Sequence, residues 1–229
     1  MNDQRPPASR PMPPRAHGLL GSFKHAYEGL VHTVVNQRNM KIHVVSALLV
    51  AMVGSGIVLD LATKATLIFC VLLVFFAEIL NTALEALVDL HIDEFDERAR
   101  ITKDVAAAGV LVLAIGTVAI FAAVIVTHWP LILESGDRVL RQVVAGGPLV
   151  AIGGLLLWKA RRAVWLDVLA SVAGAVLILL LASWTSSAVM TGMTAGLFAL
   201  CVVAARRRQL ADQASAANPG SAVAGPGNT

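Results

Sequence analysis

Six apolar stretches, each close to the length that a helix needs to cross a bilayer, occupy most of this chain. They cover residues 44–61, 65–90, 105–127, 139–158, 163–184 and 187–205. A helix crosses the hydrocarbon core of a bilayer with about 20 apolar residues, and an irregular backbone cannot satisfy its polar groups there. Charged residues make up 14% of the sequence, well below the roughly 25% of soluble domains. The sequence therefore predicts an all-α integral membrane protein.

The segments outside these stretches have other compositions. Residues 1–18 are rich in Pro and Arg and predict a disordered basic arm, and residues 209–229 predict a disordered tail. Between the arm and the first stretch, residues 19–43 place apolar side chains at helical spacing. This pattern favours an amphipathic helix that lies on the membrane surface.

Basic residues are distributed unevenly between the two sides of such a membrane protein. Six spans with the N-terminus inside place 15 of the 18 Lys and Arg residues in the cytoplasm, which is the usual bias. We therefore expect a multi-pass protein of the cytoplasmic membrane. The net charge of +3 reflects this orientation, and no face of basic and aromatic residues suggests binding of nucleic acid.

The C-terminal part, residues 138–208, shows no catalytic pattern and is interpreted as a transmembrane module for packing or lipid sorting. Its first stretch is interrupted by Arg141 and Pro148, among others. Gly192 and Gly196 have the spacing that permits close packing of two helices. Asp167 is the acid within a span here, and we expect it to pair with Arg161 or Arg162.

Acidic side chains inside the second apolar stretch are the strongest functional signal. Asn81, Glu85 and Asp89 lie within about 60° of Glu78 around a helix, so the four side chains form one narrow stripe. Charge at bilayer depth costs free energy, so it favours a functional interpretation.

The depth of these groups suggests a chemistry. Glu78 lies about 20 Å along the helix from the outer boundary, whereas Glu85 reaches the inner boundary near Lys103 and Asp104. Phosphoryl transfer to a lipid hydroxyl needs a base at the lipid, a divalent metal ion on the phosphates and positive charge. No glycine-rich phosphate-binding loop is present, so a nucleotide site must be built in another way.

Structural roles remain alternatives for the same residues. Asn81 and Thr82 could form hydrogen bonds between helices, and Lys103 could extend to the membrane surface as an end residue. The acids of residues 91–100 could be a solvated surface.

Residues 22–129 resemble the prokaryotic diacylglycerol kinase and undecaprenol kinase family of membrane lipid kinases. Four segments carry this resemblance, in the order and separation that the family shows: residues 22–30, 38–43, 77–89 and 103–111. The resemblance implies a core at residues 19–130, with a surface helix, three transmembrane helices and about three further C-terminal helices. It also implies a homotrimer with shared active sites, which acts on a membrane lipid with ATP and Mg²⁺.

The resemblance implies a role for each matching residue. Glu78 is the expected general base and contacts the lipid together with Ala107, Asn81 supports Glu78, and Glu85 binds the metal ion. The residues expected at the nucleotide are His25, Asp89, Glu94, Phe95, Asp96, Lys103 and Asp104.

Gln37 departs from the family pattern, which has a metal-binding glutamate at the end of the surface helix. Glutamine keeps an oxygen ligand but loses the negative charge that a hard cation prefers. The sequence therefore leaves two function classes open: an ATP-dependent kinase of diacylglycerol or undecaprenol, and a weakened or inactive scaffold. A transporter is a third and more distant alternative.

Overall fold

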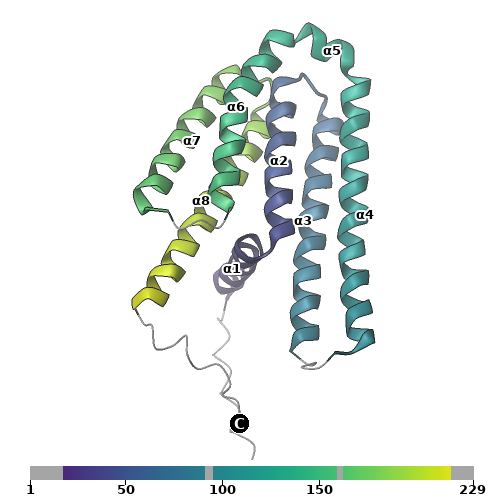
Figure 1. Cartoon of the computed structure of the whole chain (residues 1–229). Coiled ribbons are helices and arrows are strands. Elements are labelled where there is room, and N and C mark those ends of the chain that lie inside the picture. The colour runs from purple at the N-terminus through teal and green to yellow at the C-terminus, as the bar shows by residue number, and fades with distance from the viewer. Residues whose placement is uncertain (1–17, 91–94, 159–161, 218–229) are drawn as a thin grey trace, which may run out of the picture.

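The computed structural model describes residues 18–90, 95–158 and 162–217, and these residues form helices without any strand (Figure 1). The N-terminal arm and the end of the tail, for which disorder is predicted, lie outside the described residues. The helices are α1 (Leu19–Asn36), α2 (Arg38–Gly56), α3 (Leu61–Asp89), α4 (Glu97–Thr127), α5 (Trp129–Glu134), α6 (Gly136–Leu157), α7 (Val164–Trp184) and α8 (Ala188–Ala217).

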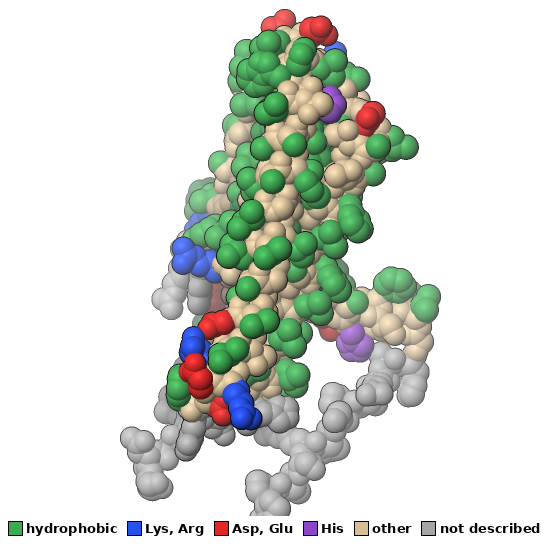
Figure 2. Space-filling model, turned by 90° about the vertical axis from the view of Figure 1, so that its right-hand side faces the viewer, with side chains coloured by type: hydrophobic (Ala, Val, Ile, Leu, Met, Phe, Trp, Pro, Cys, Tyr) green, Lys and Arg blue, Asp and Glu red, His purple; other side chains and the backbone are tan. Residues whose placement is uncertain are grey.

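Six of these helices, α2, α3, α4, α6, α7 and α8, are long and apolar enough to cross a membrane. Figure 2 shows a face covered by hydrophobic side chains over most of its length, with charged side chains mainly toward its two ends. The predicted all-α membrane fold is therefore confirmed. The short helix α5 was not predicted, and it lies at the end of the molecule opposite α1 (Figure 1).

Helix α1 carries exposed apolar side chains, as a helix on the membrane surface should. Leu19, Leu20 and Phe23 are all largely exposed. The helix ends at Asn36, earlier than the predicted boundary at residue 43, because the backbone of Gln37 is extended (φ −87°, ψ 124°). Residues 38–43 belong instead to α2, where Met40 is fully buried in the core.

The connection between α2 and α3 also differs from the prediction. The first apolar stretch was expected to remain helical to residue 61, but the chain becomes extended at Ile57. The hydroxyl group of Ser186 donates to the carbonyls of Ser55 and Ile57 at 2.8 Å, which joins this connection to the turn before α8. Asp60 begins α3 by accepting a hydrogen bond from the backbone N–H of Thr63, and bonding to Thr63 holds the pKa of Asp60 below its ordinary value.

Helix α2 joins two groups of helices. On one side it packs against α6 and α8, and on the other side it contacts α3, which forms an antiparallel hairpin with α4 (Figure 1). Val110 is the one buried residue of α4, because α3 is the main neighbour of this helix within the described residues. The C-terminal module thus packs on the first transmembrane helix and leaves the α3–α4 hairpin uncovered.

Close packing in the C-terminal module occurs at glycines other than the predicted pair. A Cβ atom at Gly146 would meet the side chain of Met52, and one at Gly174 would meet the ring of Phe198. A Cβ atom at Gly192 or Gly196 would meet nothing within 4 Å, so this pair makes no close helix contact within the described residues.

Two further expectations about this module need correction. Pro148 lies inside α6, which continues without a break from Gly136 to Leu157. Helix α8 continues to Ala217, into the segment for which a disordered tail was predicted. The extra turns contain Leu, Gln and Ala, which favour helices.

Candidate active site

The acidic stripe of α3 is buried at its inner members. Glu78 is 1% exposed and Asn81 is 4% exposed, whereas Glu85 is half-buried and Asp89 is exposed. Burial within the protein therefore decreases along the stripe from Glu78 toward Asp89.

Glu78 and Asn81 line a small pocket of about 210 Å³ between α2, α3 and α4. Its other lining residues are Asn39, Ile42, His43, Ala107, Val110, Leu111 and Ala114. Glu78 Oε2 and Asn81 Oδ1 are both buried, and neither has a hydrogen-bond partner within the described residues. Because a buried carboxylate oxygen without a partner costs free energy, this pair favours a ligand over a purely structural role.

An apolar groove of about 230 Å³ adjoins this pocket. The two share Ile42, His43 and Ala114, and the groove continues along α2, α3 and α4 past Val74 and Val118. A pocket with a few polar side chains that adjoins an apolar groove suits an amphiphilic ligand, with its hydroxyl group at one end and its hydrocarbon at the other.

Hydrogen bonds fix the stripe along α3. The Asn81 side-chain nitrogen donates to Glu85 Oε1 at 2.9 Å, which orients the Asn81 oxygen away from Glu85. The Thr82 hydroxyl donates to the carbonyl of Glu78 at 2.8 Å, within its own helix. The alternative role of Thr82 in bonding between helices is therefore not seen in this structure.

Lys103 joins the two helices of the hairpin at the water boundary. Its ammonium group forms an ion pair with Asp89, so it does more than extend to the membrane surface. Asp104 pairs instead with Arg100 at 2.8 Å, and Arg100 also pairs with Glu97 at 2.6 Å. The predicted nucleotide residues Asp89, Lys103 and Asp104 therefore lie together at one end of the α3–α4 hairpin.

The other predicted nucleotide residues are less closely grouped. Asp96 begins α4, where its carboxylate accepts hydrogen bonds from the backbone of Arg98 (2.7 Å) and Ala99 (3.0 Å). Phe95 beside it is 83% exposed. His25 lies on α1 and is 3.6 Å from Glu28, and Glu94 lies outside the described residues.

The oxygen atoms of this stripe suit magnesium. Within the described residues there is no group of three His, Cys, Asp or Glu side chains that could bind a metal ion. Magnesium, however, is usually held by one or two carboxylates together with the phosphates of a nucleotide. The half-buried carboxylate of Glu85 fits such an incomplete protein site. Gln37 lies at the break between α1 and α2, and its side-chain oxygen is also a possible metal ligand.

Two residues that line the pocket were missed by the interpretation of the sequence. Neither Asn39 nor His43 was expected at this site. Both line the pocket with Glu78. They are four residues apart, so their shared face of the first transmembrane helix was a signal in the sequence.

Comparisons with known proteins agree with this geometry. The family model described as "Prokaryotic diacylglycerol kinase" matches residues 24–125. A diacylglycerol kinase of Escherichia coli strain K12 is 30% identical over 111 residues, which are 48% of this chain and 91% of that protein. The chain belongs to the prokaryotic diacylglycerol kinase family. This is a family of lipid kinases, and every residue that lines the pocket lies within the matched range.

Two further relatives extend this comparison. A diacylglycerol kinase of Synechocystis is 39% identical over 104 residues, which are 45% of this chain but only 59% of that protein. An undecaprenol kinase of Bacillus subtilis is 34% identical over 94 residues, 41% of this chain and 76% of that protein. No solved structure matches the chain. Helices α6, α7 and α8 lie outside the family match.

Proposed function

We propose that this protein transfers the γ-phosphate of ATP to the hydroxyl group of a membrane lipid alcohol, either diacylglycerol or undecaprenol. One observation carries the proposal: Glu78, whose buried oxygen has no hydrogen-bond partner within the described residues, lines a small pocket that adjoins an apolar groove. The names of the related kinases from Escherichia coli and Bacillus subtilis support both lipids as candidates.

The groove would hold the hydrocarbon near the lipid hydroxyl. Ile42 and Ala114 line both spaces and mark the passage between them, and Ala107 lies on the side of the polar pocket. A lipid that enters from the membrane would then present its hydroxyl group to Glu78 without leaving the apolar environment. Such positioning supplies a large part of the catalysis in phosphoryl transfer.

Glu78 is the proposed general base. Its free oxygen accepts the proton of the lipid hydroxyl while the lipid oxygen forms a bond to the γ-phosphorus atom. The bond from that phosphorus to the bridging oxygen breaks, and ADP leaves with the electron pair. Asn81 orients the site through its hydrogen bond to Glu85, and Lys103 stabilises the negative charge of the phosphates.

Glu85 is the proposed carboxylate ligand of Mg²⁺, with Gln37 as a second, uncharged oxygen ligand. The ion would reduce the repulsion between the negative phosphates and the acidic stripe. His25, Asp89, Phe95, Asp96 and Asp104 are proposed to contact the nucleotide, and Glu94 is assigned to it through the family resemblance alone.

The proposed location is the cytoplasmic membrane, with the N-terminus and the site on the cytoplasmic side. The end of α3, the start of α4 and helix α1 lie at the same end of the molecule, which agrees with the distribution of basic residues (Figure 1). We also propose a homotrimer. The exposed apolar surface of α4 supports this, since it leaves room for a second copy beside the pocket.

A kinase assay with both lipids in parallel tests this function. Purified protein in detergent micelles is expected to transfer labelled phosphate from ATP to diacylglycerol or undecaprenol, in a reaction that needs Mg²⁺. Transfer to neither lipid, from protein that is folded and in micelles with either substrate, would support the alternative of an inactive scaffold.

Gln37→Glu is expected to improve the use of Mg²⁺. The change adds a carboxylate at the break between α1 and α2, so the Mg²⁺ concentration for half-maximal rate should fall by about tenfold. A Mg²⁺ titration of the kinase rate measures this effect. Gln213→Glu, in the exposed C-terminal part of α8, is the matched control. An unchanged Mg²⁺ requirement in Gln37→Glu would show that Gln37 is not part of the proposed metal site.

A further inference from the structure

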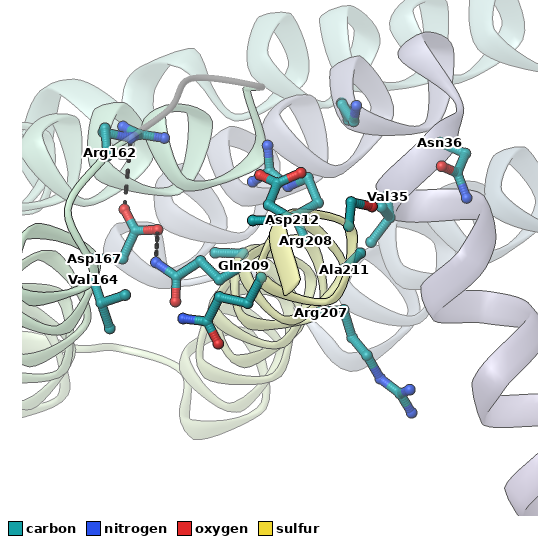
Figure 3. A pocket seen from close by; sticks show the side chains of 15 residues that line it. Val35, Asn36, Arg162, Val164, Asp167, Arg207, Arg208, Gln209, Ala211 and Asp212 are labelled. Atoms are coloured by element: carbon teal, nitrogen blue, oxygen red, sulfur yellow. Dashed lines mark hydrogen bonds and ion pairs between the residues drawn. The ribbon is translucent and has the colours of Figure 1, made fainter. Parts of the chain in front are cut away.

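A second polar pocket lies outside the kinase site. It has a volume of about 680 Å³ and is formed by the junction of α1 and α2, the start of α7 and the C-terminal part of α8 (Figure 3). The walls from α7 and α8 fall outside the family match, so nothing in the family explains them. The pocket lies toward the end of the molecule where α1 is found (Figure 1).

Two arginines of this pocket bind the C-terminal end of α6. Arg162 donates through Nη2 to the carbonyls of Leu155 and Trp158, and Arg208 donates through Nη2 to the carbonyl of Leu156. The last carbonyls of a helix have no partner within it, so these bonds satisfy them. The interaction fixes both guanidinium groups in place.

Some of the remaining donors of both arginines are buried without a hydrogen-bond partner. Three nitrogen atoms have no hydrogen-bond partner within the described residues: Arg162 Nε, Arg162 Nη1 and Arg208 Nε. The Arg162 side chain is only 15% exposed, so water cannot readily replace the missing partners. The two positive charges are also close enough to repel each other. Buried donors on charged groups are costly without an acceptor, so helix capping alone does not account for the arrangement.

The acids nearby offset only part of this charge. Asp167 Oδ1 lies 3.5 Å from Arg162 Nε, while Asp167 Oδ2 accepts a hydrogen bond from Gln209 at 2.6 Å (Figure 3). This confirms the expected pairing of Asp167 with Arg162. The arginines that line the pocket outnumber its acidic lining residues by one: Arg162, Arg207 and Arg208 against Asp167 and Asp212.

We propose that this pocket binds the phosphate group of an anionic lipid at the membrane surface. A phosphate monoester has several acceptor oxygens and negative charge, which match the free donors of two arginines and the charge excess. The pocket volume lies within the roughly 300–1,000 Å³ of small-ligand sites. A lipid source is favoured because α1, with its exposed apolar side chains, places the pocket beside the membrane surface. The proposal does not depend on the kinase activity.

Lipid binding by the full chain tests this site. Native mass spectrometry in detergent, with phosphatidic acid and with phosphatidylcholine of the same acyl chains, gives the affinity for each lipid. Phosphatidic acid is expected to bind wild-type protein at a site that Arg208→Gln weakens by about tenfold. Arg206→Gln removes the same charge from the exposed face of the same helix and is expected to leave this binding unchanged.

A second variant and a second ligand complete the test. Asp167→Asn removes a competing carboxylate and keeps both arginines, so it should bind phosphatidic acid at least as tightly as wild-type protein. Inorganic phosphate is expected to compete weakly, and phosphate that binds as tightly as the lipid would overturn the lipid source. Equal affinity of folded wild-type and Arg208→Gln protein for phosphatidic acid would overturn the site itself. Phosphatidylcholine that binds with the same affinity as phosphatidic acid, and with the same dependence on Arg208, would also overturn it.

Discussion

Glu78→Gln is expected to lower the rate of lipid phosphorylation by about 10²- to 10⁴-fold, the usual contribution of a general base. The glutamine has nearly the same shape as the glutamate and fills the same space between α2, α3 and α4, so the pocket should persist. It cannot accept the proton of the lipid hydroxyl, so the loss should appear in kcat rather than in the KM for ATP. Steady-state kinetics with labelled ATP measure both quantities.

Thermal unfolding in detergent separates this effect from damage to the fold. Glu78 is buried with an oxygen that has no partner, so replacing its charge should leave the unfolding temperature unchanged or slightly higher. Glu134→Gln, an exposed position on α5 at the other end of the molecule, is the matched control and should keep full activity. Full activity of Glu78→Gln would exclude Glu78 as the base.

Glu85→Gln is expected to raise the Mg²⁺ concentration for half-maximal rate by about 10- to 100-fold. The glutamine oxygen can still accept the hydrogen bond from Asn81, so the orientation of Asn81 should be retained. What is lost is the charge that a hard divalent cation prefers. A Mg²⁺ titration at saturating lipid measures the change, and part of the rate should return at high Mg²⁺.

The same titration distinguishes a metal ligand from a residue that only supports Asn81. Replacing Asn81 by leucine removes the hydrogen bond but keeps the carboxylate of Glu85, so it should lower kcat with a smaller effect on the Mg²⁺ requirement. A rate of Glu85→Gln that falls without any change in Mg²⁺ dependence would contradict the metal assignment and favour a purely orienting role.

The elements that local sequence specifies were largely predictable. In a membrane, an apolar stretch of about 20 residues satisfies the hydrogen bonds of its backbone by forming a helix. The six long helices therefore followed from composition and length. The stripe of Glu78, Asn81, Glu85 and Asp89 followed in the same way from the angular spacing of a helix. Both are properties of a single segment, and neither needs knowledge of its neighbours.

Helix ends were less predictable. The break at Gln37 has no proline or glycine beside it, whereas Gly54 and Gly56 stand directly before the end of α2. Burial of Met40 in the core stabilises the start of α2 at the break. Hydrogen bonding from Ser186, which is distant in the chain, stabilises the extended backbone at Ile57. Tertiary contacts therefore moved both boundaries.

By itself, the sequence determined the membrane class, the acidic stripe and the family core, because each depends on spacing within one segment or on a match along the chain. Only the tertiary structure decided that Asn39 and His43 join Glu78 at one pocket, that an apolar groove continues from it, and that Arg162 and Arg208 meet with free donors. These features form where different helices pack together. The angular position of a residue on its own helix does not reveal which side chains of another helix will face it.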